Sequence, residues 1–284
     1  MALSITNNIA ALNAYQNLTN AQDKLTSSIA KLSSGNAITT AGDNAAGLAI
    51  STGLTSQVNG LNVAATNAQS GLDVVQTASG ALTQVTSMLQ RLRDLSVQAA
   101  NDSNSVASRA DMTTEATQIT SELTRLSTST NYNGTKLLDG SATGANALAF
   151  QVGANAGADN TITVDLGSAS VTAVAAALTT GAGGTVDFTS NATSQAAITA
   201  IDAQLSTVST AQANLGAVQN RFTNAIASVN VASQNLNSAS SQITSTDMAK
   251  QMVIFTGQQV QAQAATAILA QANQLPQSVL KLLG

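Results

Sequence analysis

Hydrophobic residues recur every three or four positions over long stretches of this chain, a spacing that places them on one face of an α-helix. The longest series predicts a helix of about 47 residues, which at 1.5 Å per residue is roughly 70 Å long. Its members are Leu54, Val58, Leu61, Ala65, Ala68, Leu72, Val75, Leu82, Val85, Leu89, Leu92, Leu95 and Ala99. A shorter series predicts a second helix over 112–126, and a third predicts one continuous helix from about 195 to 244.

Both ends of the chain carry the same helical spacing, within the first 34 residues and over 247–274. Pro276 is the only proline, and we expect it to end the last helix because proline has no N–H and its ring obstructs the preceding turn. The apolar positions of the two segments, with those that follow Pro276, are the candidate core of self-assembly. They are Ile5, Ile9, Leu12, Leu25, Ile29, Leu32, Met252, Phe255, Leu269, Leu275, Val279 and Leu280.

The amino-acid composition changes between about 131 and 190, where Gly, Ala, Thr and Asn dominate. Three short runs there favour β-strands, over 148–152, 161–166 and 185–189, and predict small hairpins. The expected fold is therefore mainly α: a long antiparallel helical hairpin or coiled-coil rod, with its terminal helices packed together and a small β-hairpin region at the tip.

Composition removes most catalytic chemistry, because the chain has no His and no Cys. Zinc sites, thiol nucleophiles and Ser-His-Asp triads are excluded, so we expect no enzyme, no cofactor and no metal. The net charge is −4 with no basic cluster, and no apolar run approaches the ~18 residues of a membrane span, so we expect neither nucleic acid nor a membrane as partner. The N-terminus also lacks a conventional secretory signal, so export would need a dedicated apparatus.

Charged residues make up only 8% of the chain, and the predicted helices are polar through amides and hydroxyls instead. Burying a hydrogen-bonded amide or hydroxyl costs far less free energy than burying an ion. We therefore infer that most faces of the molecule meet other copies of the same chain.

Two residues mark the connection after the first predicted helix. Gly35 is interpreted as part of a turn, and Asp43 as the cap of a helix that begins near Ala45. A catalytic pair of Asp43 with Lys31 or Lys24 is the alternative, but a lone carboxylate in an Ala/Gly turn is more often a cap.

Several long motifs at both ends of the chain resemble those of bacterial flagellin, the subunit of the flagellar filament. They cover roughly residues 1–140 and 192–284, and the middle of the chain, which varies within that family, does not match. The motifs are residues 5–13 (ITNNIAALN), 32–35 (LSSG), 45–50 (AAGLAI), 90–101 (QRLRDLSVQAAN), 131–138 (NYNGTKLL), 214–222 (NLGAVQNRF) and 269–280 (LAQANQLPQSVL).

This resemblance implies that the terminal helices form a coiled coil lining a filament core, that a helical rod surrounds it, and that the middle segment faces outward. The expected domains are an N-terminal core helix and turn (1–42), N-terminal rod helices (43–130), a short β-rich variable outer region (131–192), a C-terminal rod helix (193–245) and a C-terminal core helix (246–284).

The resemblance also implies a function, that of a structural subunit which self-assembles into the extracellular flagellar filament used for swimming. The implied partners are other copies of the chain, the flagellar type III export apparatus, a chaperone for the C-terminal helix, and the filament cap and junction proteins. In the family, the positions matching Arg91, Leu95 and Gln98 pack against a neighbouring subunit and are also bound by a host Toll-like receptor. These three residues are thus expected to form a rod-packing face and a candidate receptor face.

Where this sequence departs from the flagellin pattern, an uncharged residue replaces a charged one. Ala37 and Gln212 stand where the family commonly has Arg, and Asn44 stands where a second Asp is frequent. Our hypothesis is that amide and hydroxyl hydrogen bonds replace salt bridges in the core helices, so that filament stability depends weakly on salt and on pH between about 5 and 9.

Two other functions share these terminal helices. One is a junction protein that joins hook to filament, and the other is a flagellin-like cell-surface binding protein. Electron microscopy of the purified protein distinguishes a filament subunit from a junction protein, because only the filament subunit forms micrometre filaments.

Overall fold

The computed structural model describes the backbone of residues 8–283 and the side chains of residues 8–274. The chain forms two compact units. The terminal unit comprises residues 1–56 and 235–284, and the central unit comprises residues 57–234.

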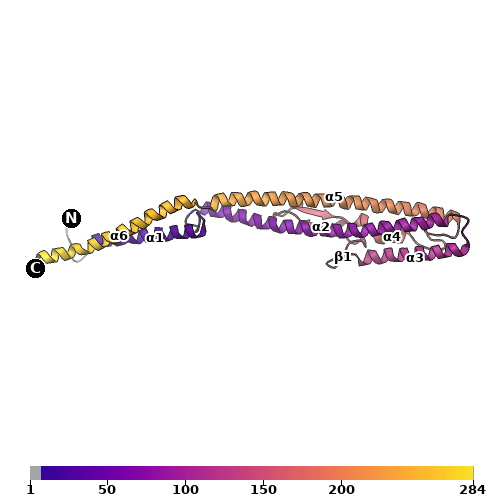
Figure 1. Ribbon diagram of the computed structural model, residues 1–284, viewed down its shortest axis with the longest axis horizontal. Helices are drawn as coiled ribbons and strands as arrows, with labels where there is room; N and C mark the ends of the chain where they lie inside the picture. Colours follow the sequence, from indigo (N-terminus) through magenta and orange to yellow (C-terminus); the bar gives the residue numbers. More distant parts are fainter. Residues whose placement is uncertain (1–7, 284) are drawn as a thin grey trace. The chain divides into compact units, whose positions relative to one another are not determined.

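The terminal unit is built on two antiparallel helices that lie side by side, α1 (Ile9–Ser34) and α6 (Met248–Leu283) (Figure 1). Helix α1 begins after Asn8, whose side-chain Oδ1 accepts the N–H of Ala11 at 3.1 Å and so caps the first turn. It ends at Gly35, which has a φ of 70°, the left-handed conformation that glycine adopts readily at helix ends.

Backbone hydrogen bonds connect the segment after α1 with residues 244–246, which precede α6. The N–H of Ala37 donates to the carbonyl of Thr244 at 2.7 Å, and that of Thr246 donates to the carbonyl of Gly35 at 2.9 Å. Asn36 pairs with Ser245 in an antiparallel bridge. These bonds hold the two connections together without any particular side chain.

The central unit is built on most of α2 (Ala45–Ala99) and most of α5 (Asn191–Thr244), which run antiparallel within it (Figure 1). It also contains α3 (Val106–Ser129), which lies against α2. The hydrophobic stripes face one another, because burying them removes apolar surface from water. Leu82, Val85, Leu89 and Leu92 of α2 and Ile201 of α5 are each 0% exposed. The mainly helical fold is thus confirmed, as is the continuous helix expected over about 195–244.

The segment between α3 and α5 forms two small hairpins and a short helix. Strands β1 (Asn131–Tyr132) and β2 (Thr135–Lys136) pair across Asn133 and Gly134, both with positive φ, as a type I′ hairpin turn requires. Strands β3 (Leu148–Gln151) and β4 (Thr161–Val164) pair antiparallel, with Leu148 opposite Val164. The short helix α4 (Val171–Ala177) packs on α3. Single 3-10 turns occupy 144–146, 158–160 and 167–169.

The second hairpin lies along the side of α2 rather than at its end. The side-chain amide of Asn67 donates to the carbonyl of Gln151 at 3.2 Å, and a Cβ on Gly60 would lie 2.9 Å from that of Ala154. The chain turns round instead where Asn191 donates to the carbonyl of Ala100. The β-rich segment therefore covers the rod and adds to its core.

Two expectations about single elements were wrong, and one element was missed. Residues 185–189 form no strand, only a bridge between Thr180 and Val186, and α4 was not expected. Helix α6 does not end at Pro276 but continues to Leu283. A proline removes one helical hydrogen bond without ending the helix where another group satisfies the freed carbonyl. Here the side-chain amide of Asn8 donates to the carbonyl of Ala272 at 2.9 Å.

Candidate self-assembly surface

The contact between α1 and α6 follows the spacing of a coiled coil, with inward residues alternating three and four apart. Half of these residues are Ala or Ser, and they are more shielded from solvent than most of their neighbours. The inward positions are Ala11, Ala14, Leu18, Ala21, Leu25, Ser28 and Leu32 of α1, and Gln251, Phe255, Gln258, Ala262, Ala265, Leu269 and Ala272 of α6. We call this set the seam.

The residues predicted as the self-assembly core divide between the seam and the outer surface. Leu25, Leu32, Phe255 and Leu269 belong to the seam and are half-buried. The others lie on the outer surface, with exposed fractions of 65% for Ile9, 66% for Leu12, 50% for Ile29 and 48% for Met252. Ile5 and the side chains of Leu275, Val279 and Leu280 lie outside the described residues.

Helix α6 carries a second apolar stripe on its solvent side, which our sequence prediction missed. Val253 is 73% exposed and Val260 is 64% exposed, seven residues and hence two turns apart. We define the outer face of α6 by the exposed residues that continue this spacing, namely Ala249, Val253, Val260, Ala264 and Ala267. Their heptad spacing is visible in the sequence, but so many positions of this helix are apolar or small that no single stripe stands out.

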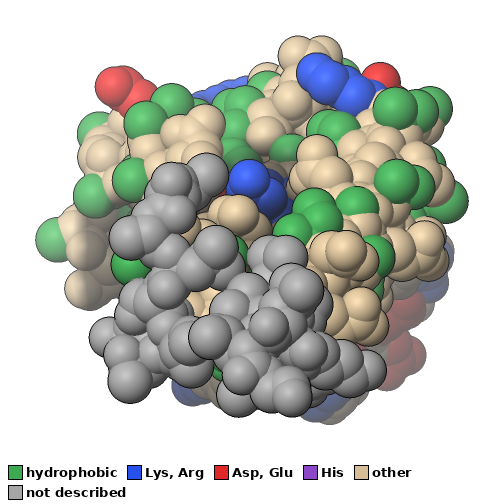
Figure 2. Space-filling view, turned by 90° about the vertical axis from the view of Figure 1, so that its left-hand side faces the viewer, with side chains coloured by type: hydrophobic (Ala, Val, Ile, Leu, Met, Phe, Trp, Pro, Cys, Tyr) green, Lys and Arg blue, Asp and Glu red, His purple; other side chains and the backbone are tan. Residues whose placement is uncertain are grey.

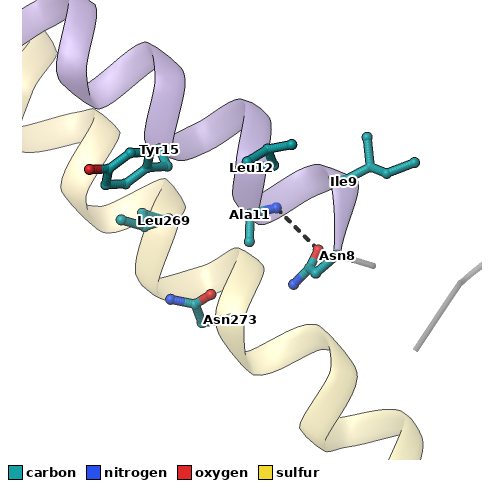
Figure 3. Close-up of a pocket in the computed structure, with 7 residues that line it drawn as sticks. All are labelled: Asn8, Ile9, Ala11, Leu12, Tyr15, Leu269 and Asn273. Carbon is teal, nitrogen blue, oxygen red and sulfur yellow. Dashed lines mark hydrogen bonds between the residues drawn. The ribbon is translucent and has the colours of Figure 1, made fainter. Parts of the chain in front are cut away.

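The start of α1 presents apolar side chains on two sides. Tyr15 lies beside Leu269 of α6, whereas Ile9 and Leu12 point away from that helix (Figure 3). A groove at this end is lined by Asn8, Ile9, Ala11, Leu12, Tyr15, Leu269 and Asn273. Apolar groups thus face solvent on the side of α1 opposite its partner helix.

Charge is nearly absent from these surfaces. Residues 251–274 include no Asp, Glu, Lys or Arg. Among the described residues of the terminal unit, the ion pair that forms joins Lys31 and Asp43 at 2.7 Å. Figure 2 shows hydrophobic side chains spread over the visible face, with a few Lys or Arg and Asp or Glu side chains among them. An exposed apolar face without charged groups that would repel another subunit is typical of a protein–protein contact.

The turn between α1 and α2 differs in one residue from our prediction. Asn44, not Asp43, caps α2, because its Oδ1 accepts the N–H of Gly47 at 2.9 Å. Asp43 instead binds Lys31 and accepts the N–H groups of Thr39 and Thr40, each at 3.0 Å. The hydrogen bond from Lys31, followed by those from Thr40 and Thr39, holds the pKa of the Asp43 carboxyl well below its usual range.

The three residues of the predicted receptor face do not share one surface. Arg91 and Gln98 are exposed, but Leu95 is 2% exposed and belongs to the core of the central unit. The Nε of Arg91 donates to Glu115 of α3 at 2.7 Å. Leu95 is thus a rod-packing residue within the subunit, and the sequence spacing could not distinguish the edge of the stripe from its buried part.

Neutral hydrogen bonds occur at two positions where the chain departs from the family pattern. The side-chain amide of Gln212 donates to Oγ1 of Thr86 at 3.4 Å, joining α5 to α2, and Asn44 caps α2 as described. Ion pairs nevertheless remain in the central unit, where Nε of Arg93 contacts Asp202 at 2.6 Å.

Other kinds of site find little support in the described part of the chain. No group of three or more acidic side chains gathers there in a way that would hold a metal ion. Within the same residues, no helix has the length and hydropathy needed to cross a membrane.

Comparison with protein families gives two matches that leave only the ends and the variable middle uncovered. A model of the bacterial flagellin N-terminal helical region matches residues 5–143, and a model of the bacterial flagellin C-terminal helical region matches residues 198–283.

Individual proteins are similar over nearly their full length. A flagellin of Halalkalibacterium halodurans is 42% identical over 279 residues, covering 98% of this chain and 99% of that protein. A flagellin of Bacillus subtilis is 39% identical over 303 residues, covering 99% and 100%. Flagellin FlaB2 of Treponema pallidum is 38% identical over 287 residues, covering 98% and 99%.

Proposed function

The chain belongs to the bacterial flagellin family, and we propose that its copies join through the outer face of α6 and the exposed start of α1. As a flagellin it is a structural subunit of the flagellar filament, the organelle of swimming motility. The observation that carries the proposed surface is the exposure of Ile9, Leu12, Val253 and Val260 on helices that already pair through the seam.

Burial of these side chains supplies the driving force for assembly. Fully burying one Val or Leu side chain contributes about 1.5–3 kcal/mol, and each subunit offers several. The absence of charge from 251–274 means that no ion must be desolvated when a neighbour packs on α6. This also agrees with a role that rests on packing rather than catalysis.

Further partners follow from the same exposed helices. We propose that the flagellar type III apparatus exports the chain to an extracellular filament, that a chaperone covers α6 before assembly, and that the cap and junction proteins contact the polymer. What supports a chaperone is the apolar outer face of α6, since such a face on a lone subunit invites aggregation.

Recognition by a host Toll-like receptor is proposed for two residues only. Arg91 and Gln98 are open to a partner, whereas Leu95 is not. In the filament this surface would also take part in packing between rods, so a receptor would meet it on subunits that are not assembled.

The proposed surface is tested by placing a charge on it. Val260→Glu should abolish filaments in electron micrographs of the purified protein, because assembly would bury an unpaired carboxylate. Val106 is 86% exposed at the first residue of α3 in the central unit, and Val106→Glu is the matched control. A Glu there favours the helix N-terminus, so this variant should form filaments like those of the unchanged chain.

Circular dichroism should give the same helix content for both variants. Filaments of ordinary number and length from Val260→Glu would show that the outer face of α6 is not an assembly contact. Equal loss in both variants would show that the effect is not specific to that face.

A further inference from the structure

The seam of the terminal unit does not specify its own register well. Alanine occupies Ala14 and Ala21 of α1 and Ala262, Ala265 and Ala272 of α6. Small side chains make shallow knobs and holes, and a shift of α1 by seven residues exchanges Ala14 for Ala21 and Leu18 for Leu25. Something other than close packing must select the register that is observed.

One end of the seam is held by Asn8. Pro276 has no N–H, so the carbonyl of Ala272, four residues earlier in α6, has no helical donor. The side-chain amide of Asn8 donates to that carbonyl at 2.9 Å, while the Oδ1 of the same side chain caps α1. Ala272 is 5% exposed, so water has little access to take over the bond. This hydrogen bond, the proline clamp, exists only when Asn8 lies beside Ala272.

The other end is held by Ser28, which is 3% exposed. Its hydroxyl donates to Oε1 of Gln258 at 2.5 Å and accepts from Nε2 of Gln251 at 3.0 Å. A shift of seven residues along the seam would leave the buried hydroxyl of Ser28 with only one of these two partners. We call this arrangement the serine clamp. It lies 20 residues from Asn8, or about 30 Å along α1.

We propose that the proline clamp and the serine clamp, rather than the packing of the seam, fix the register of α1 against α6. The proposal concerns pairing within one chain and does not depend on which outer faces join neighbouring subunits. It gives Asn8, Ser28, Gln251 and Gln258 a positioning role, and it makes Pro276 a register determinant instead of a helix end.

The proline clamp is tested by a double-mutant cycle. Asn8→Asp keeps the oxygen that caps α1 but removes the amide donor. Amide hydrogen exchange over residues 262–274 of the full chain should become roughly five- to tenfold faster, as expected for loss of one buried hydrogen bond. Pro276→Ala restores a helical N–H for the Ala272 carbonyl, so Asn8→Asp in that background should change exchange by less than about twofold.

If Asn8→Asp speeds exchange equally in both backgrounds, the amide does not act through the carbonyl freed by Pro276. No effect in either background would also overturn the clamp.

The register itself can be read by disulfide formation, since the chain contains no cysteine of its own. Ser28 contacts Gln251 and Gln258, which lie on either side of Phe255. Because α1 and α6 are antiparallel, Ala21, seven residues before Ser28, lies opposite the turn of α6 that contains Ala262. The pair Ala21→Cys with Ala262→Cys therefore reports the observed register. Ala14→Cys with Ala262→Cys reports a seven-residue shift, because in the observed register that pair is separated by about 10 Å along the helix. A disulfide needs Cα atoms within about 7 Å.

The unchanged background should give only the Ala21–Ala262 crosslink within one chain, separated from crosslinked dimers on a non-reducing gel. Removing both clamps, with Asn8→Asp, Ser28→Ala, Gln251→Leu and Gln258→Leu, should raise the shifted crosslink at least tenfold. If only the Ala21–Ala262 crosslink forms after both clamps are removed, packing alone sets the register. Shifted crosslinks of equal yield in the unchanged background would show that no single register exists.

Discussion

At the scale of single residues, the lack of a side chain decides how closely elements of the central unit approach. A Cβ on Gly71 of α2 would lie 2.5 Å from Cζ of Phe222 and 3.1 Å from Cγ of Phe150. The two rings meet edge to face at a centroid distance of 5.5 Å. Gly71 is therefore where α5 and strand β3 both rest on α2.

We predict that Gly71→Ala lowers the free energy of unfolding by about 1–3 kcal/mol, because the rings must move to admit the methyl group. Gly80 lies in the same helix with nothing within 4 Å of its Cβ position. Gly80→Ala is thus the matched control and should stabilise by about 0.5–1 kcal/mol through helix propensity. Urea unfolding measures both, and destabilisation by both variants would refute the packing explanation.

Asp43 shows where residue-level prediction from the sequence failed. Two adjacent residues, Asp43 and Asn44, both have side chains that cap helices well, and local propensity does not choose between them. The choice depends on Lys31, which lies in another helix and binds Asp43. The chemistry of the turn was predictable, but the assignment of roles needed a tertiary contact.

At the scale of elements, α2 shows what a single cap contributes. Its first turn has no acidic residue, so the Oδ1 of Asn44 is the side-chain acceptor that the described structure provides for the N–H of Gly47. The backbone bonds of the connection after α1 hold the preceding segment in place independently of that cap.

We predict that Asn44→Ala destabilises the start of α2 by about 1 kcal/mol, whereas Asn44→Asp changes it little because Asp is an equally good cap. Hydrogen exchange of residues 48–54 reports this locally. Equal protection in Asn44→Ala and the unchanged chain would contradict the assignment of the cap.

Helix existence followed from three- and four-residue spacing, as in α2, α3 and α5. The ends of helices were predicted less well from the sequence, since α6 continues through Pro276. The reason is physical: the spacing records which side is buried, whereas the effect of a proline depends on whether a distant donor such as Asn8 reaches the freed carbonyl.

At the scale of the whole molecule, the scarcity of titratable groups governs the response to pH. The chain has no His. Several carboxyls are bound by cations through side-chain hydrogen bonds, which lower their pKa values below the ordinary range. They are Asp43 with Lys31, Glu122 with Arg125 and Asp202 with Arg93.

We predict that stability is nearly constant between about pH 5 and 9 and falls below about pH 4. A carboxyl whose pKa is lower in the folded chain than the ~3.9–4.3 of the unfolded chain binds protons more weakly when folded. Its contribution is complete above the unfolded pKa and is lost as the pH falls. Thermal unfolding across this range, and filament turbidity at about 1 M salt, measure the response. A steep midpoint between pH 5 and 9 would contradict the prediction.

The sequence by itself determined that the chain is a charge-poor set of long amphipathic helices without His or Cys chemistry, because spacing and composition are local properties. It also predicted which residues of the terminal helices are apolar. Only the tertiary structure decided which of those residues close the seam and which face outward, that Leu95 is buried, and that the second hairpin lies along α2. These outcomes depend on which faces meet, and several faces of each helix are apolar enough to be buried.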